Sequence, residues 1–291
     1  MTNIIELKKY DLTTTLGKHA LAKNMLDLPQ APSPVIHRFG PGVYIREASY
    51  LKGTLIVGQD HLNEHINMLL KGKINVFNDN GDVVTLEAPY MFVAKPGSKI
   101  GYALEDVTWQ NIYSTTETDV EKLEKILFKA PEFFNNYVDQ KLLQSIDKYQ
   151  KDRDDFELVL KETGWSKEDV RRISDFEEDK IPFPYGSYSI APSESPIQGK
   201  GLFATAHIFK EETIAPMRIN DKRTPAGYLV NHAKNPNTKA VLTNNGDMYL
   251  VAIKEINGMN GGQLGEELTL DYRQVMLINN LWDGEIKCHQ P

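Results

Sequence analysis

Three short groups of residues in the last third of the chain have the types and spacing that ligand binding or catalysis requires. The first group is Gly199, Lys200, Gly201 and Leu202, in which two glycines flank one residue just before an apolar stretch. Because glycine has no side chain, backbone N–H and C=O groups can come close to a small polar ligand. Taken alone, the same residues are more often a glycine-rich turn.

The second group is residues 231–237 (NHAKNPN), and the third is residues 265–272 (GEELTLDY). Asn231 and His232 supply amide and imidazole donors and acceptors, and Pro236 disfavours helix, which predicts a loop. Alternating leucines in the third group predict a half-buried strand, with Tyr272 pointing opposite to Asp271. Taken alone, these groups are more often a polar turn and a tyrosine that only packs.

In this order the three groups resemble the SET domain of protein lysine methyltransferases. That family has a Gly-x-Gly before a strand, then Asn-His-x-x-x-Pro-Asn, then Gly-Glu-Glu-Leu-x-x-Asp-Tyr, and residues 186–273 contain all three. The resemblance implies a SET-type β-fold in which Asn231-His232 and Asp271-Tyr272 meet in a knot-like crossing. It also implies an enzyme that transfers a methyl group from S-adenosylmethionine to a lysine of a protein substrate.

The same resemblance assigns roles to individual residues. Tyr272 would be the catalytic residue, beside the transferred methyl group. The residues in contact with the cofactor would be Gly199, Lys200, Gly201, Leu202, Asn231, His232 and Tyr272. A lysine side chain has a pKa of about 10.4 in water, so an apolar channel and the positive sulfonium must favour the neutral amine before it attacks. The residues expected to line that channel are Tyr228, Tyr249 and Trp282.

The sequence departs from the family pattern at several positions. Ala233 stands where the family usually has a cysteine, and the zinc-binding cysteine cluster after the last tyrosine is absent, since Cys288 is the single cysteine. Residues 257–264 resemble an insertion. With these departures the sequence resembles small viral and bacterial forms of the domain. Without the cysteine cluster, the substrate channel must close in a different way. One alternative is a non-catalytic SET-like binding module, which would keep cofactor or peptide affinity without turnover.

The first third of the chain has a different pattern. Short apolar runs at 43–45, 54–57, 74–77, 83–86, 90–93 and 109–113 are divided by Gly, Pro and Asn-Asp clusters, which predicts a β-sandwich or barrel. The turn at residues 78–81 (NDNG) predicts a β-hairpin, because Asn-Gly readily adopts the positive φ angles of tight turns.

Residues 53–112 resemble a cupin-like β-barrel. Metal-binding cupins place two histidines and a glutamate in a first motif and a further histidine in a second. Here the first motif has His61, with His65 near the usual position of the glutamate and Gln59 where another histidine would lie. No histidine follows Pro96-Gly97 in the second motif. The metal ligands therefore stay unknown: His61 and His65 could hold a metal with Glu64 or water, although a structural or assembly role explains them better.

Helical spacing of apolar residues replaces the strand pattern after Thr116, and Ser166 is expected to cap a helix that runs to about Phe176. The predicted organisation is an N-terminal arm (1–34), a cupin-like β-barrel (35–116), a helical connector (117–180) and a SET-like domain (181–291). The fold class is therefore mainly β with a helical connector. We expect the barrel and helices to mediate self-association as a homo-oligomer, or to present substrate.

Composition excludes some kinds of partner. The formal net charge of −7 argues against nucleic acid, whose binding needs clustered Lys and Arg. A single cysteine excludes an intrachain disulfide framework and fits a reducing compartment, so we expect a cytoplasmic protein, or one of the host cytoplasm if viral. No secretory segment and no stretch near the roughly 20 apolar residues of a membrane span is found, which predicts no membrane association.

Overall fold

The computed structural model describes residue 7, residues 9–78 and residues 80–283. Two compact units make up the chain. The first contains Met1–Gln140, Tyr185–Ser187 and Met259–Gln263, and the second contains Lys141–Pro184, Tyr188–Gly258 and Leu264–Pro291. Cys288, Asp79 of the predicted turn and the two ends of the chain lie outside the described residues. The four-part division proposed from the sequence stays a prediction.

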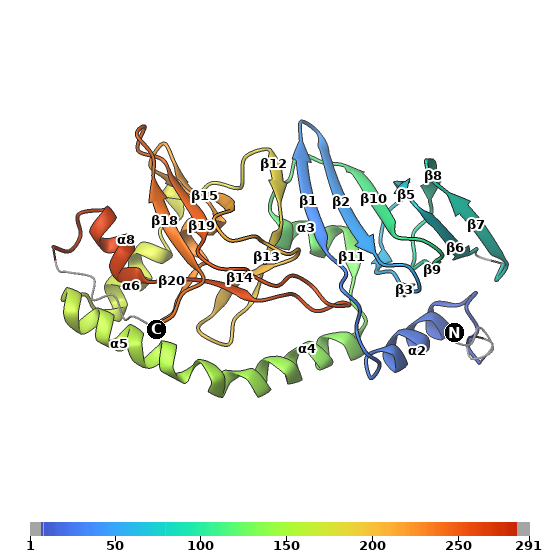
Figure 1. The fold of residues 1–291 in the computed structure, drawn as a ribbon, viewed down its shortest axis with the longest axis horizontal. Coiled ribbons are helices and arrows are strands. Elements are labelled where there is room, and N and C mark those ends of the chain that lie inside the picture. The colour runs from blue at the N-terminus through green and yellow to red at the C-terminus, as the bar shows by residue number, and fades with distance from the viewer. Residues whose placement is uncertain (1–6, 8, 79, 284–291) are drawn as a thin grey trace. The chain divides into compact units, whose positions relative to one another are not determined.

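Three sheets, of six, four and two strands, form the first unit (Figure 1), and the smallest pairs β4 (Asp60–His61) with β11 (Phe128–Lys129). The six-stranded sheet has the order β12 (Gly186–Tyr188), β1 (Val35–Gly40), β2 (Val43–Tyr50), β10 (Val107–Ser114), β5 (His65–Lys71), β8 (Tyr90–Ala94). The four-stranded sheet has the order β3 (Leu55–Val57), β9 (Ile100–Ala103), β6 (Lys73–Phe77), β7 (Val83–Glu87). After β2 the chain passes back and forth between these sheets. The predicted strands are confirmed, but the described strands pair as separate sheets rather than as one closed barrel.

The strands of the first unit bury one face against a shared core. Side chains of β1 alternate between buried and half-buried, as a strand with one face on a core requires. One core cluster contains Leu69, Ile74, Leu86, Ala103 and Val107, which come from strands of the six-stranded and the four-stranded sheet. The hairpin between β6 and β7 is confirmed, because Phe77 pairs with Val83 and the Asn78 N–H donates to the Asp82 carbonyl over 2.9 Å.

Helices begin and end where local signals indicate. They are α2 (Thr15–Met25), α3 (Val120–Leu127), α4 (Glu132–Ser145), α5 (Gln150–Thr163) and α6 (Lys167–Ser174). Ser166 caps α6 as predicted, with a reciprocal capping box to Asp169, and α6 ends at Ser174. Gly164 ends α5 in the left-handed region, at φ 73°. Among the described helices, none has both the length and the apolar composition needed to cross a membrane.

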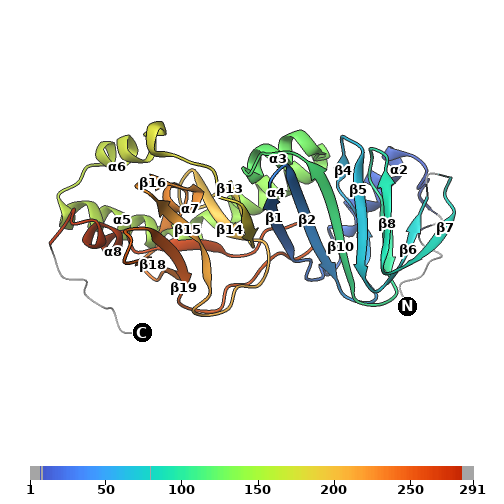
Figure 2. The same cartoon turned by 90° about the horizontal axis from the view of Figure 1, so that it is seen from above.

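Two four-stranded sheets form the second unit (Figure 2). One has the order β13 (Ile190–Glu194), β14 (Lys200–Ala204), β20 (Glu267–Leu270), β17 (Asn231–His232), and the other β16 (Lys222–Arg223), β15 (Thr213–Ile219), β19 (Met248–Ala252), β18 (Thr238–Leu242). Short helices α7 (Pro225–Tyr228) and α8 (Tyr272–Ile278) complete it. β17 runs parallel to β20, with Asn231 opposite Thr269 and His232 opposite Leu270. A knot-like threading of these segments stays a prediction.

Two expectations for the third sequence group are wrong. All four residues of β20 are buried, so the strand is not half-buried. Its polar residues Glu267 and Thr269 are buried because side chains of the Asn-His loop bond to them: Asn237 Nδ2 donates to the Glu267 carbonyl over 2.8 Å. Tyr272 does not alternate with Asp271 along a strand, because Asp271 is the N-cap of α8 and Tyr272 is its first residue.

Candidate functional site

Asn231 brings the Gly-x-Gly segment and the third sequence group together in the second unit. Its amide nitrogen lies 3.1 Å from the carbonyl oxygens of Gln198 and Lys200, and 2.7 Å from Glu267 Oε1. Ser195 Oγ, 3.0 Å from the same nitrogen, donates to the Glu267 carboxylate over 2.8 Å. All three predicted groups therefore meet at one place, and the amide nitrogen of Asn231 is occupied by the chain itself.

Tyr272 is fixed against the Asn-His loop by two hydrogen bonds. Its backbone N–H donates to His232 Nδ1 over 3.2 Å, and its hydroxyl donates to the Val230 carbonyl over 3.0 Å. The rings of Tyr272 and His232 pack edge to face, with centroids 5.4 Å apart. Burial, together with the nearby Glu267 carboxylate, raises the pKa of Tyr272 to about 12. The hydroxyl therefore stays protonated at neutral pH.

The other nitrogen of His232 is held by helix α5. Nε2 lies 3.0 Å from Asp155 Oδ2, so a neutral ring carries its proton on Nε2 while Nδ1 accepts from Tyr272. Burial lowers the pKa of His232, although the hydrogen bond to Asp155 acts in the opposite direction. The lowered pKa favours the neutral ring. Asp155 also accepts from Arg273 Nη1 over 2.8 Å. Burial alone would raise the pKa of Asp155, but the bonds from Arg273 and His232 outweigh it and lower that pKa.

Glu267 is a buried carboxyl group of the second unit. Its side chain accepts from Ser195 and Asn231, and the residue is 5% exposed. Burial raises the pKa of Glu267, although both hydrogen bonds favour the charged form. The chemistry available here is that of hydrogen-bond acceptors near a protonated phenol.

The two glycines of the first group differ in their surroundings. A Cβ on Gly201 would lie 2.2 Å from Glu267 Oε1 and 3.2 Å from Asn231 Nδ2, so protein side chains fill the space that we assigned to a ligand. Gly199 adopts φ +52°, and a Cβ there would meet nothing within 4 Å. Lys200 is exposed, whereas the side chain of Leu202 is fully buried in the core. The open part of the loop is therefore Gly199 and Lys200.

The three residues expected to line a channel lie on separate elements. Tyr228 ends α7, two residues before the carbonyl that binds Tyr272, and the Lys180 ammonium lies 4.9 Å from its ring centroid. Tyr249 is a half-buried residue of β19, opposite Val241. Trp282 follows α8 and is half-buried. Of these three residues, Tyr228 is the nearest in sequence to Val230, whose carbonyl accepts the hydrogen bond from the Tyr272 hydroxyl.

Two residues essential to this arrangement, Asp155 and Arg273, were missed by the sequence analysis. Both were outside the residues that the resemblance named: Asp155 lies in the predicted helical connector (117–180), where helix α5 begins at Gln150. A usable signal was present, because Asp155, Val159 and Glu162 recur at helical spacing and would share one face. Arg273 directly follows Tyr272 and binds Asp155 and, through Nε at 2.6 Å, Glu162.

In the first unit, His61 and His65 lie side by side. Their rings stack with centroids 4.1 Å apart, His61 Nδ1 lies 2.6 Å from the Tyr113 hydroxyl, and His65 Nδ1 lies 3.0 Å from the Asn63 carbonyl. Burial, with smaller contributions from His65 and Arg46, lowers the pKa of His61 to about 3. A neutral imidazole could bind a metal ion. Among the residues that the structure describes, however, no three His, Cys, Asp or Glu side chains form a metal-binding group.

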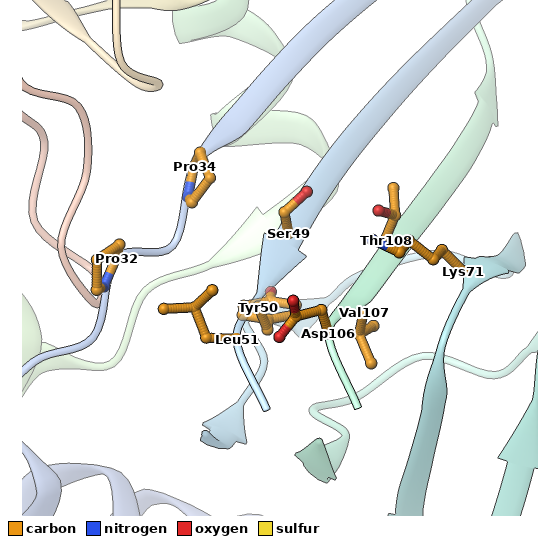
Figure 3. Close-up of a pocket in the computed structure, with 9 residues that line it drawn as sticks. All are labelled: Pro32, Pro34, Ser49, Tyr50, Leu51, Lys71, Asp106, Val107 and Thr108. Carbon is orange, nitrogen blue, oxygen red and sulfur yellow. The ribbon is translucent and has the colours of Figure 1, made fainter. Parts of the chain in front are cut away.

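Neither of the other two residues considered as metal ligands completes such a set. Gln59 Nε2 donates to Glu124 over 3.2 Å, and Glu64 is exposed. A separate pocket of about 260 Å³ in the same unit is lined by Pro32, Pro34, Ser49, Tyr50, Leu51, Lys71, Asp106, Val107 and Thr108 (Figure 3). His61 and His65 are not part of its lining.

Comparison with known proteins gives similarity only to solved structures; no family model and no curated protein matches the sequence. A cupin superfamily protein from Desulfitobacterium hafniense is 11% identical, covering 29% of this chain and 80% of that one, with a TM-score of 0.25. KdgF from Halomonas sp. is 20% identical (27% and 74% covered, TM-score 0.23). A double-stranded beta-helix protein from Klebsiella pneumoniae is 16% identical (29% and 76% covered, TM-score 0.26). The first is described as a cupin superfamily protein and the third as a protein with a double-stranded beta-helix domain, and at these TM-scores the likeness carries no further argument.

Proposed function

We propose that the second unit transfers a methyl group from S-adenosylmethionine to the side-chain amine of a lysine in a protein substrate. The observation that carries the proposal is the convergence of three sequence-distant groups: Asn231 bonds to the Lys200 carbonyl, and His232 and the Val230 carbonyl hold Tyr272. A set of unrelated turns would not be expected to meet through side chains that the family pattern names.

The residues present fit the chemistry of such a cofactor. Gly199 has open space beside it, and residues 198–200 are exposed, although their carbonyl groups already accept from Asn231 and Ser195. Gly199 and Lys200 would hold the cofactor through their backbone, with Asn231, His232 and Tyr272 beside it, whereas Glu267 and Asn231 already fill the space beside Gly201. When bound, it would supply an electrophilic methyl group on a positively charged sulfur.

Tyr272 would orient the attacking amine. Its hydroxyl hydrogen is directed to the Val230 carbonyl, so the oxygen lone pairs are free to accept an N–H from a neutral lysine side chain. Such a bond fixes the direction of the nitrogen lone pair, and positioning of this kind can lower a barrier by roughly 7–11 kcal/mol in favourable systems. The amine loses its proton to solvent on entering an apolar site, so no dedicated base is required.

The test is methyl transfer by wild type and Tyr272→Phe. Incubation with labelled S-adenosylmethionine and cell lysate should label a protein on lysine with wild type, whereas Tyr272→Phe should lose at least about 100-fold in rate, as loss of a positioned polar group does. Cofactor affinity, measured by calorimetry, should change less than about twofold because the phenyl ring remains.

Tyr185→Phe, at an exposed tyrosine of the first unit, is the matched control and should leave transfer unchanged. Equal rates in wild type and Tyr272→Phe would remove Tyr272 from the mechanism. Cofactor binding without any transfer would instead favour the non-catalytic binding module.

A second candidate is a cupin-type metal-dependent function of the first unit, which the stacked pair of His61 and His65 favours. Metal analysis of the purified chain tests it. One equivalent of metal in wild type that disappears in His65→Ala would support this candidate, and absence of stoichiometric metal would exclude it.

A further inference from the structure

Strand β8 lies at one edge of the six-stranded sheet of the first unit. β5 pairs with one side of it, from His65 opposite Ala94 to Leu69 opposite Tyr90. Figure 2 shows β10, β5 and β8 side by side at this end of the sheet. Among the described strands, none pairs with the other side of β8. Its backbone N–H and C=O groups on that side are therefore available to another strand.

The edge strand itself lacks the usual protection against pairing, which is limited to Pro89 before it and to Lys95 and Pro96 after it. Its sequence, Tyr-Met-Phe-Val-Ala, contains no charged residue and no proline, whereas exposed edges commonly carry lysine, proline or a bulge. Tyr90 is 46% exposed, Met91 59% and Val93 67%. A strand of this composition is suited to pair with another apolar strand rather than with a charged segment.

The apolar surface continues from β8 across the sheet. Val93 lies opposite Ile66, Ile66 opposite Ile112, and Ile112 opposite Ile45, so one row of branched apolar side chains crosses four strands. In the next row, Met91 lies opposite Met68. This is the side of the sheet that faces away from the core, because the neighbouring residues His65, Asn67 and Leu69 of β5 are buried on the other side.

We propose that β8 pairs in antiparallel fashion with β8 of a second copy of this chain, which joins the two six-stranded sheets into one. With the two-fold axis at Phe92, Met91 of one copy lies opposite the partner's Val93, and Val93 opposite the partner's Met91. The row from Ile45 to Val93 then continues into the partner's methionine row. Each copy supplies the same unpaired edge and the same two apolar rows, so the surface is complementary to itself.

A second copy fits this edge better than a foreign peptide would. A peptide strand can use the backbone groups of β8, but it brings no sheet to extend the row of Ile45, Ile112 and Ile66. The chain carries a net charge of −7, so an edge that contained acidic residues would repel its own copy; β8 contains none. The pairing is independent of the function proposed for the second unit.

The test is the mass of the full-length chain in solution. Sedimentation over micromolar concentrations should show wild type as a dimer of the 33.0 kDa chain, and Val93→Lys should raise the dissociation constant at least about tenfold, since a charge on the shared row loses the apolar contact. Met91→Lys should act in the same direction. Val83→Lys, at a residue 53% exposed on β7 of the other sheet, is the matched control and should leave the dimer intact.

Hydrogen exchange gives a second measurement that needs no variant. Amides of β8 in wild type should exchange more slowly as concentration rises through the dissociation constant, while those of β7 should not change. A wild-type chain that stays monomeric at all concentrations would overturn the proposal. So would a dimer that Val93→Lys and Met91→Lys leave unchanged while both variants retain wild-type circular dichroism.

Discussion

Tyr272 is positioned by contacts to its backbone, its ring and its hydroxyl, and each of these depends on another residue of the second unit. The backbone N–H binds His232, whose opposite nitrogen is held by Asp155. Asp155 is 5% exposed and has Arg273 as its cationic partner. The orientation of the proposed catalytic residue is therefore set through a chain of buried polar groups, whose members would be costly to leave unpaired.

Asp155→Asn should weaken this chain. The amide lacks the charge that balances Arg273, so the free energy of unfolding should fall by about 2 kcal/mol, the typical worth of a hydrogen bond to a charged group. Methyl transfer should fall in kcat more than in KM, because substrate contacts remain. Asp154→Asn, on the same helix but exposed, is the control. Urea unfolding together with steady-state kinetics checks both; equal stability of the two variants would contradict a role for Asp155.

Gly201→Ala should be more harmful than Gly199→Ala. At Gly201 the new methyl group would meet Glu267 Oε1, which is held by Ser195 and Asn231 and cannot easily move. We expect a loss of about 1–3 kcal/mol in unfolding free energy from this overpacking. Gly199→Ala has open space and should lose only the roughly 1–2 kcal/mol of a left-handed residue. Chemical denaturation of both variants decides the order, and the reverse order would refute this account of the loop.

Helix α5 is the element that the second unit uses to complete the site. It supplies Asp155 to His232 and places the Phe156 ring 5.9 Å from the Tyr272 ring in an edge-to-face contact. Asp152 on the same helix accepts from the Lys234 N–H over 2.9 Å. In the absence of a cysteine cluster after Tyr272, this helix is the part of the described chain that covers the Asn-His loop and the tyrosine.

Phe156→Ala should therefore lower both stability and transfer. Loss of the half-buried ring and its aromatic contacts should reduce the free energy of unfolding by about 2 kcal/mol. The rate of methyl transfer should fall because the Tyr272 ring loses the packing contact with Phe156 that restricts its rotamers. Leu158→Ala, two residues away and 49% exposed, should stay within about 0.5 kcal/mol of wild type. Thermal melts and initial rates make the comparison, and a harmless Phe156→Ala would show that α5 does not support the site.

At the scale of the whole molecule, buried histidines make stability depend on pH. Burial, with a smaller effect of Arg46, lowers the pKa of His37 to about 3, and His61 is lowered to about 3 as well. In the unfolded chain both titrate near 6.5. Below that pH the unfolded chain therefore binds protons that the folded chain does not, and the stabilising effect is lost as pH falls from about 6.5 toward 3.

We expect the free energy of unfolding to fall by up to about 1.4 kcal/mol per pH unit for each of these histidines over that window. His37→Gln should make the dependence less steep, because the amide can still bond to Tyr44, 2.7 Å from His37 Nδ1, without titrating. Urea titrations at several pH values measure this pH dependence. Identical slopes for His37→Gln and wild type would contradict the role given to His37.

The sequence by itself determined the short strands, the helix caps and the order of the three groups that carry the proposed chemistry. These depend on local signals: short apolar runs divided by turn residues predicted strands such as β2, β6 and β10, and Ser166 followed by Asp169 marked a helix start. The resemblance also named Asn231, His232 and Tyr272; the structure joins His232 to Tyr272 and pairs Asn231 with Thr269, three residues before Tyr272. Such features need only neighbouring residues or a fixed spacing.

Only the tertiary structure decided what surrounds those residues. That Glu267 and Asn231 fill the space beside Gly201, and that Asp155 holds His232 across 77 positions of sequence, depends on long-range packing that no local spacing encodes. The same holds for the separation of the β-strands into open sheets and for the exposed edge at β8, because strand order is a property of the whole chain. Burial, which sets the pKa values of His37, His61 and Tyr272, exists only once those layers have formed.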